Sequence, residues 1–162
     1  MMLLRKRAWD IMNEDFSTIE DSASLAEAVR TLRDSMKETP DNHVVVVKKK
    51  NGSLRGVVSI WTMLKAVEEM VLKDEDLNLT EEADWDRAFK RAGTACCSEA
   101  VEAYIEEDVA ILKPTDPMLV VLEIFRKKKR TWALVQEGGN IIGVVLLSDV
   151  YREVTRDLVQ QF

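Results

Sequence analysis

Two stretches of the chain repeat one another, and this duplication limits the possible folds more than any other feature. Residues 15–33 align without a gap with residues 108–126, and each stretch begins with aspartate and ends with arginine. Further along, residues 54–64 align with residues 141–151, so that one Gly-Val-Val triplet faces another. Few positions are identical, but apolar and turn-forming residues come in the same order. The chain is therefore expected to use one folding unit twice.

The first half of the unit is a strand followed by a helix. Short apolar stretches bounded by polar residues predict strands at residues 16–19 and 109–112. In the first repeat Ser24 and Glu27 have the spacing of a capping box, which marks the start of a helix. In the second repeat Asp116-Pro117 predicts an N-cap followed by proline at the first helical position.

The second half of the unit is a pair of strands joined by a tight turn, followed by a helix. Asn51-Gly52 and the Gly-Gly-Asn of residues 138–140 are hairpin signals. The apolar runs beside them are typical of strands buried on both faces. The expected bounds are strands 44–47 and 54–60 with helix 61–72, and strands 132–135 and 141–147 with helix 148–160.

The sequence thus predicts an α/β (α+β) fold of two βαββα repeats that pack together, because one such unit has too small a core to fold alone. The expected domains are repeat 1 at residues 7–72, a connector at 73–100 and repeat 2 at 101–160. The connector is acidic and then amphipathic. A helix is expected to begin at Thr80–Glu82, to end near Gly93, and to pack on the module or across an oligomer interface.

Composition excludes several classes of function. The 162 residues carry 23 Lys and Arg against 29 Asp and Glu, a net charge of −6, whereas nucleic-acid-binding domains are normally basic. One His and two Cys are too few for a four-ligand zinc site, so no metal site and no catalytic group is expected. No apolar run is long enough to span a bilayer, which argues against a membrane partner. Apolar residues precede the first charges, unlike in a signal peptide, so a cytoplasmic location is expected.

The two cysteines, Cys96 and Cys97, are adjacent. A disulfide between neighbouring residues needs strained geometry, so free thiols are expected. A redox-sensitive pair is the alternative.

The order of elements and several short motifs resemble the CBS domain, the repeat named after cystathionine β-synthase, which occurs as a tandem pair called a Bateman module. The motifs are Asp-Ile-Met at 10–12, Gly-Val-Val-Ser at 56–59, and Gly-Val-Val at 143–145 followed by Ser-Asp-Val at 148–150. The resemblance extends over about residues 7–154 apart from the connector. It implies a regulatory module rather than an enzyme, with no required cofactor and with its repeats packed around a pseudo-twofold axis.

The resemblance also implies two clefts between the repeats, which often hold AMP, ADP, ATP or S-adenosylmethionine. The family's signature is Gly-x-x-Ser/Thr-x-x-Asp, in which the carboxylate binds the ribose, the hydroxyl and the helix N-terminus suit a phosphate, and apolar strand residues pack on adenine. In this sequence neither repeat has both the hydroxyl and the aspartate of the signature. Repeat 1 has Ser59 but Thr62 in place of the aspartate, and repeat 2 has Asp149 but Leu146 in place of the hydroxyl.

The candidate ligand-binding residues implied in this way are Asp149, Ser148, Ser59, Thr62, Val58, Val145, His43 and Thr131. A purely structural interpretation stands beside each assignment. Asp149 is also expected in the first turn of a helix capped by Ser148, where the helix dipole favours an acid. Ser59 is equally an ordinary buried hydroxyl, and His43 a loop residue. The basic run 126–130 is either a solvated face or a docking place for ligand phosphates or for an acidic partner.

Two functions follow from these observations. The first is a stand-alone CBS pair that binds an adenosine-containing ligand and passes a change of shape to a protein target. The second is a structural or protein-interaction module that has lost its ligand sites, as the incomplete signatures suggest. In either case the resemblance implies a homodimer. The apolar faces of residues 61–72 and 150–158 are either its candidate surfaces or part of the intramolecular core.

Overall fold

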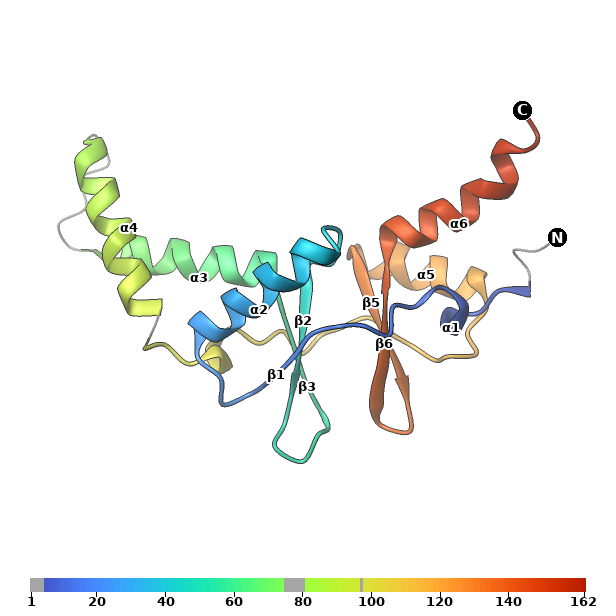
Figure 1. Cartoon of the computed structure of the whole chain (residues 1–162), viewed down its shortest axis with the longest axis horizontal. Helices are drawn as coiled ribbons and strands as arrows, with labels where there is room; N and C mark the ends of the chain where they lie inside the picture. Colours follow the sequence, from blue (N-terminus) through green and yellow to red (C-terminus); the bar gives the residue numbers. More distant parts are fainter. Residues whose placement is uncertain (1–4, 75–80, 97) are drawn as a thin grey trace.

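The computed structural model describes residues 5–74, 81–96 and 98–162, and it contains two three-stranded sheets with helices around them (Figure 1). The elements of the first half are α1 (Ala8–Ile11), β1 (Thr18–Glu20), α2 (Leu25–Glu38), β2 (Val44–Lys48), β3 (Leu54–Ser59) and α3 (Ile60–Leu72). The connector holds α4 (Glu82–Cys96). The second half begins with the short 3-10 helix η2 (Val101–Tyr104), followed by β4 (Ile111–Leu112), α5 (Met118–Lys128), β5 (Trp132–Glu137), β6 (Asn140–Leu146) and α6 (Leu147–Val159). The predicted βαββα order is confirmed in both halves.

The two sheets have the same topology and the same register. In each, the first strand pairs parallel with the second, and the second pairs antiparallel with the third. Gly56 of β3 lies opposite Val47, and Gly143 of β6 lies opposite Val135. In both sheets the register shifts directly after that valine. The duplication in the sequence is therefore a duplication in backbone geometry.

The sheets pack face to face, and their outer faces are covered by helices. Successive side chains of a strand point to opposite faces. Val45 and Val47 consequently pack against helices α2 and α3, whereas Val44 and Val46 pack against the second sheet. The residues that meet them from that sheet are Trp132, Leu134, Ile141, Val144 and Leu146. Each fully buried valine or leucine stabilises the fold by about 1.5–3 kcal/mol, so this shared layer ties the two halves together.

The leading segment of each repeat packs on the other repeat. From the start of the first repeat, the Ala8 N–H donates to the Asp116 carbonyl over 2.9 Å, and Asn13 exchanges two backbone hydrogen bonds with Val144 of β6 (2.8 and 3.0 Å). From the start of the second repeat, Glu106 exchanges two backbone hydrogen bonds with Val57 of β3 (2.9 and 2.8 Å). The two repeats therefore interlock through their leading segments.

The helix starts agree with the sequence in one repeat and differ in the other. Ser24 caps α2 as predicted, because its hydroxyl accepts from the Glu27 N–H at 3.1 Å. Asp116 does not cap α5. The N-cap is Pro117, which has an extended backbone, and the Asp116 carboxylate instead accepts from the Lys113 N–H at 2.8 Å. The prediction that Ser148 caps α6 is also wrong, since the N-cap is Leu146 and Ser148 is already helical.

The connector helix α4 packs on α3. Of the two predicted alternatives, the structure thus has the connector packed on the module. Ala88 and Ala92 are buried in the same cluster as Met70 and Val71. The predicted end at Gly93 is wrong, because α4 continues to Cys96. An isolated glycine is tolerated inside a helix. Here Ala95 and Cys96, which follow Gly93, still pack against the same cluster as Ala88 and Ala92. The described helix begins at Glu82, the last residue of the predicted start at Thr80–Glu82, and Thr80 lies outside the described residues.

Two glycines lie beside these crossings. We expect their replacement by alanine to lower the free energy of unfolding by unequal amounts. A Cβ on Gly56 would lie 2.3 Å from the Glu106 carbonyl oxygen, and the φ of Gly56 is +154°. A Cβ on Gly143 would meet only the flexible Met12 side chain, at 2.6 Å from its sulfur. We predict that Gly56→Ala lowers the free energy of unfolding by about 3 kcal/mol and Gly143→Ala by about 1 kcal/mol, as measured by urea denaturation.

Gly93→Ala is the matched control, because a Cβ there meets nothing within 4 Å. We expect this variant to be neutral or more stable by about 0.5–1 kcal/mol, as for a glycine in a helix interior. Equal losses for Gly56→Ala and Gly93→Ala would contradict the close approach of the Glu106 carbonyl.

Candidate functional site

The two halves meet at His43 and Thr131, which hold matching places directly before β2 and β5. The His43 Nδ1 and the Thr131 Oγ1 lie 3.3 Å apart, within hydrogen-bond distance. Their carbonyls accept from the first residues of the nearby helices, His43 from the Ile60 N–H (3.1 Å) and Thr131 from the Leu147 N–H (2.9 Å). The starts of α3 and α6 are thus held on either side of one contact between the repeats.

A cleft of about 540 Å³ opens beside this contact. The first repeat contributes Asp41 and His43, and the second contributes Thr131 with the first turns of α6, namely Leu147, Ser148, Tyr151 and Arg152. The volume is in the range of small-molecule sites. Of the residues predicted from the sequence, the structure brings His43, Thr131 and Ser148 together here.

Ser148 is the most informative residue of the cleft. Its hydroxyl oxygen is buried and has no hydrogen-bond partner, although buried hydroxyls normally have one. The residue is the second of α6, where backbone N–H groups lack intrahelical acceptors and favour a negatively charged ligand. Ser148 lines the cleft, so an unpaired hydroxyl and the start of a helix lie together at one wall, where the first N–H of α6, that of Leu147, already donates to the Thr131 carbonyl.

Ser59 and Thr62, by contrast, satisfy each other. The Ser59 N–H donates to the Thr62 hydroxyl at 2.8 Å, and the Thr62 N–H donates to the Ser59 hydroxyl at 3.4 Å. Ser59 is buried and caps α3. This pair forms a capping box at the start of the helix.

Asp149 lies behind the cleft rather than on its wall. Its carboxylate accepts from the Asn13 side-chain amide at 3.1 Å and pairs with Arg152. Leu146 is buried, and the hollow beside it, between Asn13 and Phe16, measures only about 10 Å³, room for roughly one water molecule. The Asp149 carboxylate therefore holds the crossing segment to α6.

Val58 and Val145, expected to pack on a ligand, lie in the cores of their own repeats. Both are fully buried, Val58 with the helices of the first half and Val145 with those of the second. Their strand neighbours, Val57 and Val144, form the layer between the sheets.

Comparison with known proteins agrees with this geometry. The sequence model of the CBS domain matches residues 8–69 and 101–156. The chain belongs to the CBS domain family. Among curated proteins, none matches the sequence.

Solved structures show the same fold. A CBS-domain protein from Agrobacterium tumefaciens is 19% identical, with a TM-score of 0.65 over 90% of this chain and 88% of that one. CBSX2 in complex with AMP is 15% identical, with a TM-score of 0.65 over 94% and 98% of the two chains. The cytosolic domain of the Mg²⁺ channel MgtE in complex with ATP is 17% identical, with a TM-score of 0.63 over 91% of this chain and 48% of that one.

A second cleft of the CBS pair, about 410 Å³, lies between α3 and η2. Its lining includes Trp61, Thr62, Lys65, Tyr104 and Glu106. One carboxylate oxygen of Glu106 accepts from Arg130 at 3.4 Å, and the other is buried without a hydrogen-bond partner. At the matching place in the second repeat, Asn13 and Asp149 are hydrogen-bonded to each other.

Sequence reasoning missed Asp41, Tyr151 and Arg152 of the first cleft, and Asn13, which borders the hollow beside Leu146. The repeat alignment contains a signal for Asn13, because it stands as far before the first repeat's strand as Glu106 stands before the second's. Asp41 and Arg152 are ordinary surface charges in sequence, and only folding brings them to one cleft.

Across the described part of the chain, no group of three His, Cys, Asp or Glu residues is placed to hold a metal ion. None of the described helices has the length and apolarity needed to cross a membrane. Cys96 lies with its Sγ 3.3 Å from the Met70 sulfur, and Cys97 falls outside the described residues.

Tyr104, on the wall of the second cleft, provides a test of the local electrostatics. Burial raises the pKa of its phenol above the ordinary 10.0, and the charges of Glu99, Glu69 and Cys96 raise it further. In a Tyr151→Phe variant, where Tyr104 is the remaining one of the chain's two tyrosines, we predict a phenolate absorbance midpoint above pH 10.

Adding Glu99→Gln to that variant removes one of the negative charges, so the midpoint is expected to fall while staying above that of a free tyrosine. A midpoint at or below pH 10 in the folded Tyr151→Phe protein would show that Tyr104 is neither desolvated nor close to these acids.

Proposed function

We propose that this CBS pair is a regulatory module, not an enzyme, that binds an adenine nucleotide in the cleft between His43 and the first turns of α6. The observation that carries the proposal is the buried Ser148 hydroxyl, which has no hydrogen-bond partner on the wall of a cleft of ligand size. AMP and ATP in the similar structures of CBSX2 and MgtE support this class of ligand.

The lining of the cleft suits the parts of a nucleotide. Ser148, the N-terminus of α6 and His43 offer hydrogen-bond donors for a phosphate. The exposed ring of Tyr151 and the side chain of Leu147 offer an apolar surface for the base. The Asp41 carboxylate can accept from ribose hydroxyls.

The same contacts suggest how binding reaches a partner protein. The hydrogen bond between His43 and Thr131 joins the two repeats. A phosphate that accepts from His43 competes with this bond and changes how the repeats are held together. Binding then shifts the population of two arrangements of the module, which is how a ligand acts at a distance.

The nucleotide is tested by titration calorimetry with AMP, ADP, ATP and S-adenosylmethionine, on wild type and on Ser148→Ala. We predict that the substitution weakens nucleotide binding by about tenfold, the value of roughly one hydrogen bond to a charged group. Because the hydroxyl has no protein partner, the variant without ligand should melt at the wild-type temperature or slightly above it.

Ser22→Ala, at an exposed serine in a turn between β1 and α2, is the matched control and should bind like wild type. A Ser148→Ala protein that binds all four ligands with wild-type affinity would overturn the proposed site. A loss of stability without ligand would mean that the hydroxyl is structural.

A second function is favoured by a different observation. The capping box of Ser59 with Thr62, the buried Leu146 and the hollow of about 10 Å³ leave the signature positions occupied by the protein itself. This favours an interaction module without a nucleotide. Such a module predicts a melting temperature that millimolar nucleotide leaves unchanged, whereas a ligand of the folded state raises it with concentration.

A further inference from the structure

The leading segment of the second repeat carries a carboxylate oxygen that the protein leaves without a donor. One oxygen of Glu106 accepts from Arg130 at 3.4 Å, and the other is buried and has no hydrogen-bond partner. Buried polar atoms normally have a partner, and leaving a charged one without a donor costs free energy. Glu106 lines the second cleft, whose volume of about 410 Å³ is in the range of small-molecule sites. A ligand in that cleft can therefore supply the donor.

The matching place in the other repeat shows which donor is missing. In the repeat alignment Asn13 corresponds to Glu106, and Asp149 corresponds to Thr62. The Asn13 amide donates to the Asp149 carboxylate at 3.1 Å. Thr62 cannot do the same for Glu106, because its hydroxyl already donates to the Ser59 carbonyl at 2.9 Å. The second cleft thus has the acid of this contact without an N–H group to pair with it.

Two aromatic side chains line the same cleft. Trp61, at the start of α3, is 73% exposed, so its indole is open to a ligand. Tyr104, at the end of η2, is partly buried on the facing segment. The faces of aromatic rings attract cations, and the rings also pack against carbon chains. The aromatic residues therefore suit an organic cation.

The charges around the cleft favour a positive ligand. Glu69 and Glu106 line it together with one base, Lys65, which lies 4.0 Å from Glu69. Burial raises the pKa of the Tyr104 phenol, and the neighbouring negative charges, that of Glu69 among them, raise it further. A raised phenol pKa is the expected response to a negative potential.

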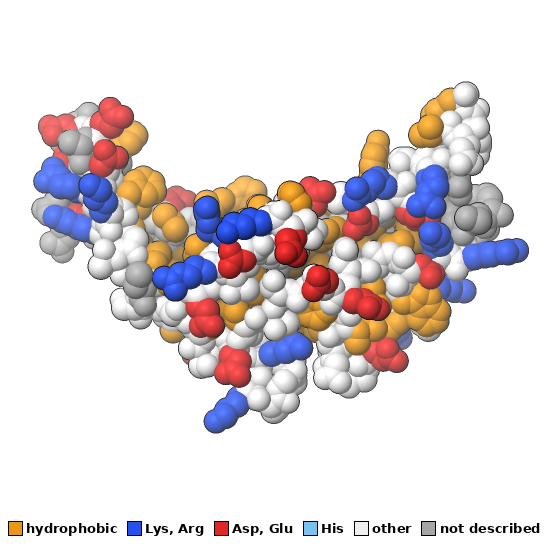
Figure 2. All heavy atoms as spheres, viewed as in Figure 1, with side chains coloured by type: hydrophobic (Ala, Val, Ile, Leu, Met, Phe, Trp, Pro, Cys, Tyr) orange, Lys and Arg blue, Asp and Glu red, His pale blue; other side chains and the backbone are white. Residues whose placement is uncertain are grey.

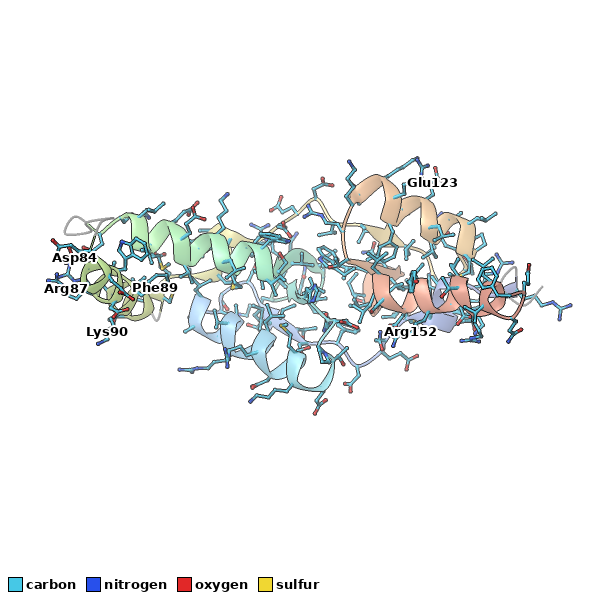
Figure 3. The ribbon with its side chains drawn as sticks, turned by 90° about the horizontal axis from the view of Figure 1, so that it is seen from above. Asp84, Arg87, Phe89, Lys90, Glu123 and Arg152 are labelled. Carbon is cyan, nitrogen blue, oxygen red and sulfur yellow. The ribbon has the colours of Figure 1, made fainter. Side chains whose placement is uncertain are left out.

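The two clefts differ in this respect. Seen from above, α3 and α6 extend in opposite directions from the middle of the molecule, and Arg152 lies on the α6 side (Figure 3). The first cleft balances Asp41 with Arg152 and holds the unpaired Ser148 hydroxyl, whereas the second has an excess of acid. On the face shown in Figure 2, acidic and basic side chains are mixed, so that face has no single acidic patch to attract cations in general.

We propose that the second cleft binds a small alkyl amine in its protonated form. The ammonium group donates to the unpaired Glu106 oxygen, in place of the amide that the other repeat supplies. The rings of Trp61 and Tyr104 lie beside the charge and the carbon chain. A metal ion fits less well, because hard cations take six or more oxygen ligands, and the described residues contain no group of three His, Cys, Asp or Glu placed to hold one.

The ligand class is tested by titration calorimetry on the protein without nucleotide, with putrescine as the probe. Butanediol has the same carbon chain without the charges, and tetramethylammonium has a charge without an N–H group. We expect putrescine to bind, butanediol to give no heat of binding, and tetramethylammonium to bind at least tenfold more weakly, because it cannot donate to Glu106. Equal affinities for tetramethylammonium and putrescine, or no binding of millimolar putrescine, would overturn the proposal.

Substitutions test the position of the site. Glu106→Gln should weaken putrescine binding by about tenfold, the value of roughly one hydrogen bond to a charged group. Glu68→Gln is the matched control, because it removes the same charge from an exposed position of α3 outside the cleft, and it should bind like wild type. Equal losses in the two variants would show a general attraction to acidic side chains and would overturn the site.

Trp61→Leu provides a second variant that does not touch the buried carboxylate. Because the indole is exposed, the variant should keep the wild-type melting temperature, while putrescine binding weakens about threefold through the lost cation–π contact. Unchanged binding in this variant would remove the indole from the site. Ser148→Ala should bind putrescine like wild type, so the outcome is independent of the proposed nucleotide cleft.

Discussion

The exchange of backbone hydrogen bonds between each leading segment and the opposite repeat governs the rest of the structure. Asn13 lies on Val144 and Glu106 on Val57, and a glycine stands one residue earlier in each receiving strand, where Gly56 leaves the room that the Glu106 carbonyl requires. Because each repeat is completed by a segment that belongs to the other, neither half has its full core without its partner. This interlocking fixes the sheets face to face and brings His43 against Thr131.

Within this symmetric frame the two repeats have diverged in chemistry. Position by position, Ser59 corresponds to Leu146, Thr62 to Asp149 and Trp61 to Ser148. In the first repeat the two hydroxyls cap a helix, and in the second the carboxylate holds the crossing segment. A cleft over the start of α6 and an exposed indole at the start of α3 therefore occupy matching places in the duplicated fold.

The sequence predicts the local elements well, because hydrophobic periodicity and turn residues act over short distances. The Val44–Val47 run and Asn51-Gly52 identify a buried hairpin that the structure contains. Asp116 stands where a helix cap is expected, but its carboxylate closes the preceding turn instead. The crossing of Asn13 onto β6, and the meeting of Asp41 with Arg152 at one cleft, depend on contacts between distant residues that no local pattern encodes.

We propose that the symmetric repeats have become unequal, with the nucleotide cleft at the start of α6. Amide NMR spectra recorded during a titration with AMP report on both repeats at once. We expect shifts concentrated at residues 41–43, 131 and 147–152, with smaller changes at the matching residues 60–65 of α3. Equal shifts at both places, or none at millimolar AMP, would contradict it.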